Sequence, residues 1–410
     1  MIKSYKIRLI PTEEQEILLW KHVNAMRYAW NWGLSLNMEQ FRKGEKHLTS
    51  ASSGKILTEL KKTNGDFKWL NDVSSQTLKM ALMDLDDAYA RFFRTQKTGE
   101  NYTKKKIARF ARKSRGLTPY DMNGHPKFKS KGEAEPKFYV RYENLYLTQN
   151  GANIEKIGKV QYRADYDDMP IVGRKCENTT KYINPRVRYI NGKWLLSFGI
   201  ERESAKKELN DFSVGIDLGV KELAVISYDH GAESKKIKNV NKSKRVRRIK
   251  KHLKQKQRNV SRKYRQNGSY AKTKGILEEE AKIKKLHRKL VSIRLDHTHQ
   301  ETCKIISLNP KRIVLEDLNV AGMMKNKHLA EAISEQMWGE FRRQIEYKAE
   351  WAGIEVAIAD RFCPSSKKCS ACGAIKRDLK LKDRVYRCSE CGLTIDRDLN
   401  AAKNLEMLAN

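Results

Sequence analysis

The sequence predicts a multidomain protein of the α/β class that also contains a β-barrel. Apolar residues recur at helical spacing from residue 12 to about residue 115, whereas short β-rich runs separated by turn residues fill residues 125–205. From residue 214 onward, strand-like and helix-like segments alternate, which favours an α/β sheet. A chain of 410 residues is long enough for roughly two to four compact units, each with its own core.

The helical region follows a short strand-like run, SYKIRLI, at residues 4–10. Thr12 and Gln15 have the spacing of a capping box, which predicts the start of a long helix. A second helix is predicted from Ser75 to Phe93. The apolar face of the first helix consists of Leu19, Val23, Met26, Trp30 and Leu34. Its indoles could stack on nucleic-acid bases, but packing in the core is the simpler expectation.

The β-rich region is predicted to form a small barrel or sandwich. Asn191 and Gly192 separate the runs RVRYI and KWLLSFGI, and an Asn-Gly pair between two such runs is a strong signal for a two-residue hairpin. The N-terminal strand could join the same sheet.

The last half of the chain begins with two strands around a tight glycine turn, VGIDLGVKELAVISY at residues 214–228, and continues into a basic segment. Residues 235–265 contain sixteen Lys or Arg residues and no carboxylate, and their apolar stripe predicts one arm of a helical hairpin that turns near Asn267. A solvated face normally mixes charges of both signs, so we expect this one to bind phosphates. The cations chosen as nucleic-acid contacts are Lys244, Arg245, Arg247 and Arg248.

Three further elements complete this half. RIVLEDLNV at residues 312–320 is predicted to be a buried strand, residues 333–353 a single helix, and residues 354–360 another strand. A closing helix is expected after the last cysteine.

The charge balance indicates a polyanionic partner. The chain has 84 Lys and Arg residues against 49 acidic residues, a formal net charge of +35, and phosphate contacts scale with such cations. A membrane surface is the rival polyanion, but no stretch approaches about 18 consecutive apolar residues. The first residues do not resemble a signal peptide. We therefore expect a cytoplasmic, nucleoid-associated protein that binds nucleic acid.

Four of the seven cysteines have the spacing of a structural zinc site. Cys369, Cys372, Cys388 and Cys391 form two C-x2-C pairs, and four thiolates fill all four tetrahedral positions around Zn²⁺. An odd number of cysteines argues against a disulfide framework. Redox-active thiols are the alternative.

Three carboxylates are candidates for a second metal site. Asp217 and Glu316 lie in apolar strands, where an ionised carboxylate is costly unless it is paired or bound to metal. Asp396 or Asp398, at the start of the closing helix, would be the third member, although acids there also favour a helix N-terminus. Such oxygen ligands suit Mg²⁺ or Mn²⁺, and two such ions can support phosphodiester cleavage.

The motifs GIDLGV, VLEDLNV, RFCPSSKKCSACG and CGLTIDRDLNAAKN, together with the helix around residues 333–353, resemble TnpB, the transposon-encoded relative of type V CRISPR effector nucleases. GHPKFKSK at residues 124–131 and the N-terminal helix fit the same family less specifically. The resemblance implies RNA-guided cleavage of DNA beside a short flanking motif, with a guide RNA from the transposon end and double-stranded target DNA as partners.

The resemblance also implies a domain layout. It places a wedge-type β-barrel at residues 1–11 and 125–212, and a helical recognition lobe at residues 12–124. An RNase H-like RuvC nuclease domain would cover residues 213–362 and 396–410, with a zinc-ribbon, target nucleic-acid-binding insert at residues 363–395.

The family's catalytic acids correspond to Asp217, Glu316 and Asp398. Asp396 is expected to cap the helix or to assist Asp398, and Asn400 to orient a phosphate. Asp317 would point to the opposite strand face, and His299 is left without a role.

Gln76 and Lys79, at the start of the second helix, are hypothesised to approach the flanking duplex. Two other functions stay open. One is a guide-RNA-dependent repressor that does not cut, and the other is a DNA strand-transferase that acts in transposition, because a fold does not fix a function.

Overall fold

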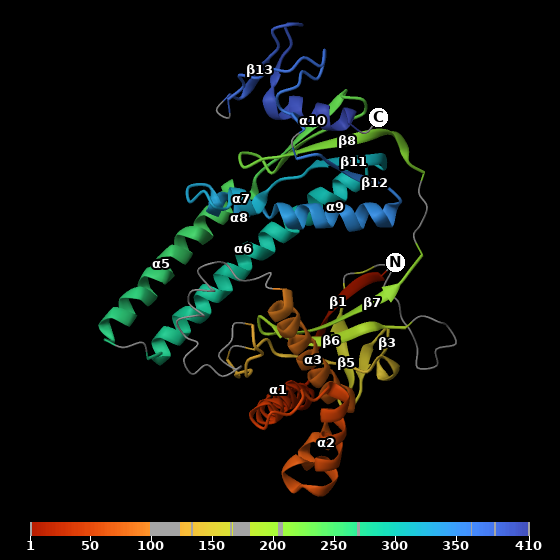
Figure 1. The fold of residues 1–410 in the computed structure, drawn as a ribbon, viewed down its shortest axis with the longest axis vertical. Helices are drawn as coiled ribbons and strands as arrows, with labels where there is room; N and C mark the ends of the chain where they lie inside the picture. The colour runs from red at the N-terminus through yellow and green to blue at the C-terminus, as the bar shows by residue number, and fades with distance from the viewer. Residues whose placement is uncertain are drawn as a thin grey trace. The chain divides into compact units, whose positions relative to one another are not determined.

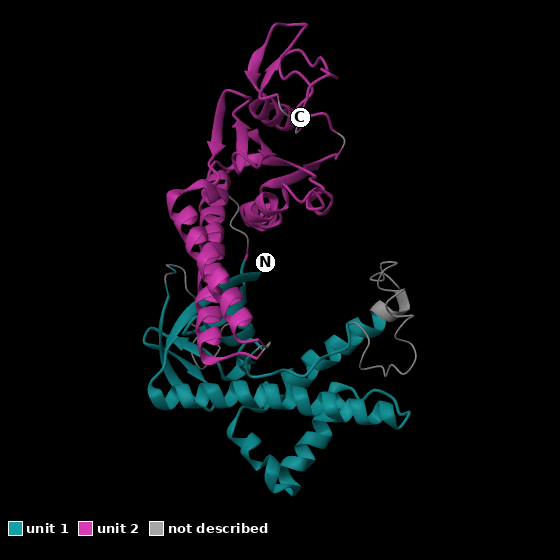
Figure 2. Ribbon diagram, turned by 90° about the vertical axis from the view of Figure 1, so that its left-hand side faces the viewer, with its two compact units in different colours: residues 1–202 teal, residues 203–410 magenta. Residues whose placement is uncertain are grey.

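The computed structural model describes residues 2–98, 124–132, 134–164, 166, 181–203, 208–268, 271–361, 363–380 and 383–408. These residues form two compact units, 1–202 and 203–410, which are coloured separately in Figure 2 and are described one at a time below. The last part of the predicted helical region, residues 99–123, lies outside the described residues.

The first unit contains the two predicted helices and a third between them. Helix α1 spans Glu13–Arg42, α2 spans Ser50–Thr63 and α3 spans Ser75–Thr98, with the 3-10 helix η1 (Gly65–Asp72) before α3. The capping box is confirmed, because Thr12 accepts a bond from the backbone N–H of Gln15, and the Gln15 side chain accepts one from the backbone N–H of Thr12. The predicted apolar face of α1 is buried, from Leu19 to Leu34.

Seven strands of the first unit form one sheet. In chain order they are β1 (Ile2–Ile10), β2 (Lys137–Tyr139), β3 (Tyr146–Thr148), β4 (Gly151–Ile154), β5 (Gly158–Arg163), β6 (Ile183–Ile190) and β7 (Lys193–Glu201). A one-turn 3-10 helix, η3 (Tyr142–Asn144), precedes β3. The order across the sheet is β2-β6-β7-β1-β5-β4-β3, and each strand runs antiparallel to its neighbours.

Two predictions about this sheet are confirmed. Asn191 and Gly192 form the hairpin turn between β6 and β7 with φ angles of 56° and 75°, and both central residues of a type I′ turn need positive φ. The N-terminal strand joins the sheet between β5 and β7. Tyr5, Ile7 and Leu9 alternate inward and share a core with the buried face of α1.

The second unit is built around a five-stranded sheet. The strands are β8 (Asn210–Leu218), β9 (Ala224–Tyr228), β10 (Glu233–Ile237), β11 (Pro310–Glu316) and β12 (Glu355–Ala359), in the order β10-β9-β8-β11-β12. Strands β8, β11 and β12 are parallel, whereas β9 and β10 are antiparallel to their neighbours. The predicted α/β sheet is therefore confirmed.

Helices cover both faces of this sheet, with α9 and α10 on opposite sides in Figure 1. Helix α9 (Trp338–Ala352) packs Phe341 and Ile345 against the face that contains Ile313 and Leu315. Helix α10 (Arg397–Met407) packs Leu405 against Val314, which points to the opposite face.

The predicted helical hairpin is present. Helix α5 spans Lys244–Gln266 and α6 spans Lys274–Ile306, and the two run side by side in Figures 1 and 2. A one-turn 3-10 helix, η4 (Val240–Lys242), precedes α5. The hairpin's own apolar cluster joins Val246, Ile249 and Leu253 of α5 to Leu290 of α6.

The prediction of one helix over residues 333–353 is wrong. The segment forms α8 (Ala330–Gln336) and α9, which are separated by Met337 in the left-handed region at φ 55°. Tertiary hydrogen bonds accompany the break. The Gln336 side chain donates to the carbonyl of Val220 at 3.0 Å, and the Asn241 side chain donates to the carbonyl of Glu335 at 3.0 Å. A short helix, α7 (Val320–Met323), precedes α8.

The cysteine-rich segment lies between β12 and α10. Its two short strands, β13 (Val385–Arg387) and β14 (Thr394–Asp396), form an antiparallel pair around buried Tyr386. No helix among the described residues is long and apolar enough to span a bilayer.

Candidate functional site

The sequence-predicted carboxylates Asp217 and Glu316 lie at the carboxyl ends of two neighbouring parallel strands. Ile216 of β8 is in register with Leu315 of β11, so each acid is the next residue along its strand. Side chains alternate along a strand, and Leu315 points to the face covered by α9. Asp217 and Glu316 therefore point to the other face, which is covered by α10.

Gly215 allows α10 to approach this face closely. A Cβ atom at residue 215 would lie 2.1 Å from the carbonyl oxygen of Ala402 and 2.3 Å from the backbone nitrogen of Glu406. Only glycine permits such an approach without moving the helix. The Glu406 carboxylate fixes α10 further, by accepting bonds from Ser227 Oγ at 2.6 Å and from the Gly231 N–H at 2.9 Å. These contacts position Asp398, in the first turn of α10, at the same end of the sheet.

The electrostatics show that the three acids are close enough to interact. Burial raises the pKa of Asp217 well above its usual value, and the charges of Glu316 and Asp398 raise it further. Burial and the Asp398 charge also raise the pKa of Glu316, against a hydrogen bond from Ser365 that lowers it. The charge of Arg397, which pairs with Asp398 at 3.0 Å, acts in the opposite direction and lowers the pKa of both Asp217 and Glu316.

This arrangement fits a divalent cation. Half-buried carboxylates that repel one another are stabilised when a cation neutralises them, and hard oxygen ligands suit Mg²⁺ or Mn²⁺. Among the described residues, however, the four cysteine Sγ atoms all lie within 4.8 Å of one another, and the oxygen atoms of the three carboxylates do not form such a group.

The remaining acids have structural roles. Asp396 is the N-cap of α10, because its side chain accepts bonds from the N–H groups of Asp398 and Leu399. It also pairs with Lys236 at 2.7 Å. Asp317 forms ion pairs with Arg342 and Arg361, on the other side of the strand from Glu316.

The expectation that Asn400 orients a phosphate is wrong. Asn400 is fully buried, accepts a bond from the N–H of Ser370 at 3.0 Å and donates to the carbonyl of Lys368 at 2.7 Å. Asn404 donates to the carbonyls of Ser365 and Lys368 at 2.7 and 2.6 Å. The two asparagines thus fasten α10 to the chain around the first cysteine pair.

His299, which was left without a role, lies beside a buried lysine. Lys348 donates to the carbonyl of His299 at 3.0 Å, to Thr302 Oγ1 at 2.6 Å and to Cys303 Sγ at 3.2 Å. Burial lowers the pKa of Lys348. This cluster ties α6 to α9, and the His299 ring lies 3.8 Å from Cys303 Sγ.

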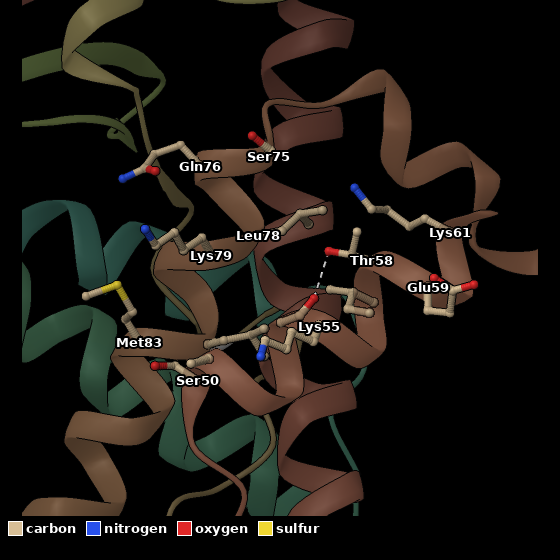
Figure 3. Close-up of a pocket in the computed structure, with 14 residues that line it drawn as sticks. Ser50, Lys55, Thr58, Glu59, Lys61, Ser75, Gln76, Leu78, Lys79 and Met83 are labelled. Atoms are coloured by element: carbon tan, nitrogen blue, oxygen red, sulfur yellow. Dashed lines mark hydrogen bonds between the residues drawn. The ribbon is translucent and has the colours of Figure 1, made fainter. Parts of the chain in front are cut away.

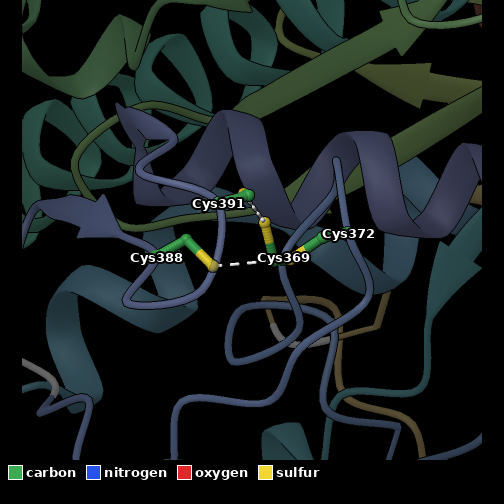
Figure 4. Close-up of side chains that lie close together, drawn as sticks. All are labelled: Cys369, Cys372, Cys388 and Cys391. Carbon is green, nitrogen blue, oxygen red and sulfur yellow. Dashed lines mark hydrogen bonds between the residues drawn. The ribbon is translucent and has the colours of Figure 1, made fainter.

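The four predicted zinc ligands meet at one point. Figure 4 shows their side chains converging, and the four Sγ atoms lie within 4.8 Å of one another. The Cys369–Cys391 and Cys372–Cys388 Sγ separations are 3.6 and 3.5 Å. A tetrahedral Zn²⁺ with Zn–S bonds of about 2.3 Å requires sulfur separations of about 3.8 Å. The quartet therefore fits zinc, and the described residues contain no disulfide that would compete for these thiols.

The four cations chosen as nucleic-acid contacts are all exposed in the first two turns of α5: Lys244, Arg245, Arg247 and Arg248. Other cations of the basic segment are neutralised by acids from elsewhere in the second unit. Lys250 pairs with Glu335, and Lys256 pairs with Glu279 at 3.1 Å. These lysines are therefore paired although residues 235–265 contain no acid, because their partners lie elsewhere in the sequence.

Gln76 and Lys79 line a groove of about 760 Å³ between α2 and α3. Figure 3 shows both side chains on α3, with Lys55 and Lys61 on α2 across the groove. Leu57, Leu78 and Leu82 form part of its apolar floor. Leu78 therefore borders the same groove as Gln76 and Lys79.

Three functional positions were missed by the sequence interpretation. Gly215 was interpreted only as part of a motif, Ser365 as part of the cysteine-rich run, and Arg397 was not considered. The motif CPSS could have indicated Ser365, because a serine hydroxyl can donate a hydrogen bond to a buried carboxylate. No sequence signal indicates the close approach at Gly215.

Three family models match the chain. Residues 197–327 match the OrfB model of IS605, described as a probable transposase, and residues 1–46 match the helix-turn-helix model of the same group. Residues 338–405, which include the four cysteines, match the TNB domain of Cas12f1-like proteins.

Full-length relatives give the same grouping. A Streptomyces pristinaespiralis protein named "Putative RNA-guided DNA endonuclease" is 30% identical over 403 residues, which cover 98% of this chain and 88% of that protein. The Escherichia coli K12 protein InsQ, with the same description, is 28% identical and is covered to 91%. A solved structure of the mini-RNA-guided endonuclease CRISPR-Cas_phi3 aligns over 100% of this chain and 92% of its own, at 12% identity and a TM-score of 0.46.

Proposed function

The chain belongs to the TnpB family, and on that premise we propose that it is an RNA-guided DNA endonuclease whose cutting site is formed by Asp217, Glu316 and Asp398. The observation that carries the proposal is the burial of Asp217 beside Glu316 and Asp398 at the ends of β8 and β11, because burial and then the charges of these two acids raise the pKa of Asp217. A cluster of this kind is costly for the folded chain unless a bound cation neutralises it.

The chemistry follows from the ligand types. Divalent cations such as Mg²⁺ or Mn²⁺, when bound, activate a water molecule and stabilise the leaving oxygen of a phosphodiester. Asp217 and Glu316 would hold them from the sheet, and Asp398 from the first turn of α10. Arg397 pairs with Asp398, and it would contact a phosphate if this pair were released.

We propose the family's domain layout for the chain. The five-stranded sheet of residues 213–362 with α10 would be the RNase H-like RuvC domain, and residues 363–395 its zinc ribbon. Residues 1–11 and 125–212 would form the wedge domain, supported by the pairing of β1 with β5 and β7. Residues 12–124 would form the recognition lobe.

The partners would be a guide RNA and double-stranded target DNA, in the cytoplasm at the nucleoid. The exposed cations of α5 would contact phosphates, and Gln76 and Lys79 would approach the duplex that flanks the target. Structural zinc would be held by the four cysteines.

Cleavage assays with purified ribonucleoprotein test the proposal. Asp217→Ala and Glu316→Ala are each expected to abolish cutting of a matched target in Mg²⁺ while guide-RNA binding is retained. Asp211→Ala is the control, because this carboxylate is 92% exposed and pairs with Lys311. Wild-type rates in either site variant would contradict the proposed site.

The same assays separate the alternatives. A repressor would bind the matched target without cutting it, and a strand-transferase would join the cut strand to a second DNA. Single-turnover cutting without joined products is expected.

A further inference from the structure

A short loop of the first unit presents an exposed aromatic ring. The loop, residues 125–131, has the sequence HPKFKSK, and the side chain of Phe128 is 55% exposed. Single exposed apolar residues are common and need no explanation. The surroundings of this ring are unusual, because the loop is held firmly on both sides of it.

Two side chains of α1 fix the backbone next to Phe128. The indole N–H of Trp30 donates to the carbonyl of Lys127 at 3.0 Å. The Asn31 amide donates to the carbonyl of Lys129 at 3.1 Å and accepts from the N–H of Lys129 at 2.8 Å. The residues before and after Phe128 are thus clamped, and the ring is directed outward.

Contacts of the flanking side chains add to this anchoring. The Lys129 ammonium lies 3.3 Å from the centre of the buried Trp30 ring, a close cation–π contact. His125 is buried against the rings of Tyr89 and Phe92, at 5.4 and 5.3 Å. An exposed ring on a loop held this way loses little conformational freedom on binding, so a partner can use its full contact area.

The charged residues around Phe128 indicate which class of partner its ring would contact. Lys127 and Lys131 are exposed beside Phe128, and residues 125–131 contain no acid. Arg27 of α1 joins Lys129 and Lys131 in lining an adjacent groove of about 230 Å³. Among the described residues that line it, the one acid is Glu135, which is paired with Arg188. A flat apolar ring among cations matches a nucleobase and its flanking phosphates, whereas a protein partner would need acidic side chains placed around an apolar spot.

We propose that Phe128 stacks on the base pair at which the target DNA duplex begins to open. This inference rests on the proposed function, because a guided endonuclease must separate the target strands before the guide can pair. Opening exposes the face of one base pair, and an aromatic ring that covers this face offsets part of the lost stacking. Lys127 and Lys131 hold the phosphates on either side.

Single-turnover cutting of two targets tests the inference. One target is fully paired, and the other carries mismatched bases beside the flanking motif, so that its strands are already separated. Phe128→Ala is expected to cut the paired target about tenfold more slowly, in line with the loss of one stacking contact. It is expected to cut the pre-opened target at nearly the wild-type rate. Phe128→Trp should restore the rate on the paired target, and Ser130→Ala, in the same loop, should have no effect.

Several outcomes would overturn the inference. Equal rates for Phe128→Ala and wild type on the paired target would show that the ring does not assist opening. Equal slowing on both targets would show that it acts after opening, and weakened guide-RNA binding would show that its partner is RNA.

Opening can also be followed without cutting. In an Asp217→Ala background, a 2-aminopurine beside the flanking motif should brighten when the duplex opens, and Phe128→Ala should suppress that signal. This measurement separates the two proposals. If wild-type protein opens the duplex but does not cut it, the proposed function fails while the inference is still tested. An undiminished signal in Phe128→Ala would remove the inference.

Discussion

The hydroxyl of Ser365 donates a hydrogen bond of 2.5 Å to Oε1 of Glu316, and the carbonyl of the same serine accepts one of 2.7 Å from Asn404. A buried residue at the start of the cysteine-rich segment is therefore bonded both to a strand carboxylate and to α10. The hydroxyl stabilises the ionised form of Glu316, which is the form that can bind a cation.

Ser365→Ala is expected to shift the pH dependence of cutting. Loss of the hydrogen bond removes an effect that lowers the pKa of Glu316, so its pKa rises and a higher pH is needed to ionise it. The acidic limb of the pH–rate profile should move to higher pH, with little change in the rate at alkaline pH. Ser389→Ala is the control, because Ser389 is exposed and contacts Glu390. An unshifted acidic limb would contradict this role for Ser365.

Gly215→Ala is expected to displace α10. The new methyl group would overlap backbone atoms at 2.1 and 2.3 Å, which cannot rotate away, so the helix that carries Asp398 must shift. We expect a loss of about 2 kcal/mol or more in the free energy of unfolding, and a cutting rate reduced at least tenfold. Gly339→Ala is the matched control, because a Cβ there meets nothing within 4 Å. Thermal melts and cleavage rates measure both effects, and unchanged cutting in Gly215→Ala would show that α10 need not be fixed.

Asp217→Asn is expected to stabilise the metal-free protein while abolishing cutting. The raised pKa of Asp217 means that the folded state holds its proton more tightly than the unfolded state. Stability from this group is therefore present at low pH and is lost as the pH rises through the folded-state pKa. Removing the charge should raise stability at neutral pH by about 1 kcal/mol.

Denaturant melts in the presence of a chelator measure this effect, with Asp211→Asn as the exposed control. Added Mg²⁺ should stabilise the wild type and not the Asp217→Asn variant. Equal stabilisation of both by Mg²⁺ would place the cation elsewhere.

Zinc is expected at about one ion per chain. Cys372→Ser removes one of four ligands, and structural zinc contributes directly to folding, so metal content and solubility should fall before any other property changes. Cys303→Ser should keep its zinc, because that thiol contacts Lys348 and not the quartet. Elemental analysis of freshly purified protein measures the zinc content, and protein without zinc would refute the assignment.

A Gln76→Ala, Lys79→Ala double variant is expected to lose cutting at targets with the correct flanking motif while it still binds guide RNA. Both residues line the α2–α3 groove, and polar side chains of this kind read base edges. Lys68→Ala is the control, because this exposed lysine of η1 lies outside the groove lining. An unchanged motif preference in a library of randomised flanks would place the motif reader elsewhere.

Sequence patterns predicted the features that depend on interactions between residues close together in the chain. The periodicity of Leu19 to Leu34 predicted the buried face of α1, and the Asn191-Gly192 pair predicted its hairpin, because helix spacing and turn sterics act within a few residues. The break at Met337 was missed because bonds to Val220 and Asn241 accompany it, and these partners lie about a hundred residues away.

The sequence likewise predicted some residues of the candidate site and not others. The sequence motifs already indicated Asp217, Glu316 and Asp398 as candidate ligands. In the structure, burial and the charges of Glu316 and Asp398 raise the pKa of Asp217. The role of Asn400 was not predictable, because an asparagine beside two acids looks like a polar ligand until its burial against Lys368 and Ser370 is known. The contribution of Gly215 depends on a helix that follows it in the chain by almost two hundred residues.

The bonds from Asn400 and Asn404 to the segment around Cys369 also set an order of assembly during synthesis. Asp217 and Glu316 leave the ribosome well before the four cysteines, and Asp398 follows the cysteines. Helix α10 can dock in its final position only on a segment that has already folded, because its two buried amides need the carbonyls of Ser365 and Lys368. On the proposed zinc assignment, that segment would fold when its thiolates capture the ion. A nascent chain in a zinc-starved cell would therefore keep its acidic cluster incomplete, so the supply of zinc would govern whether the proposed site for the divalent cation is built.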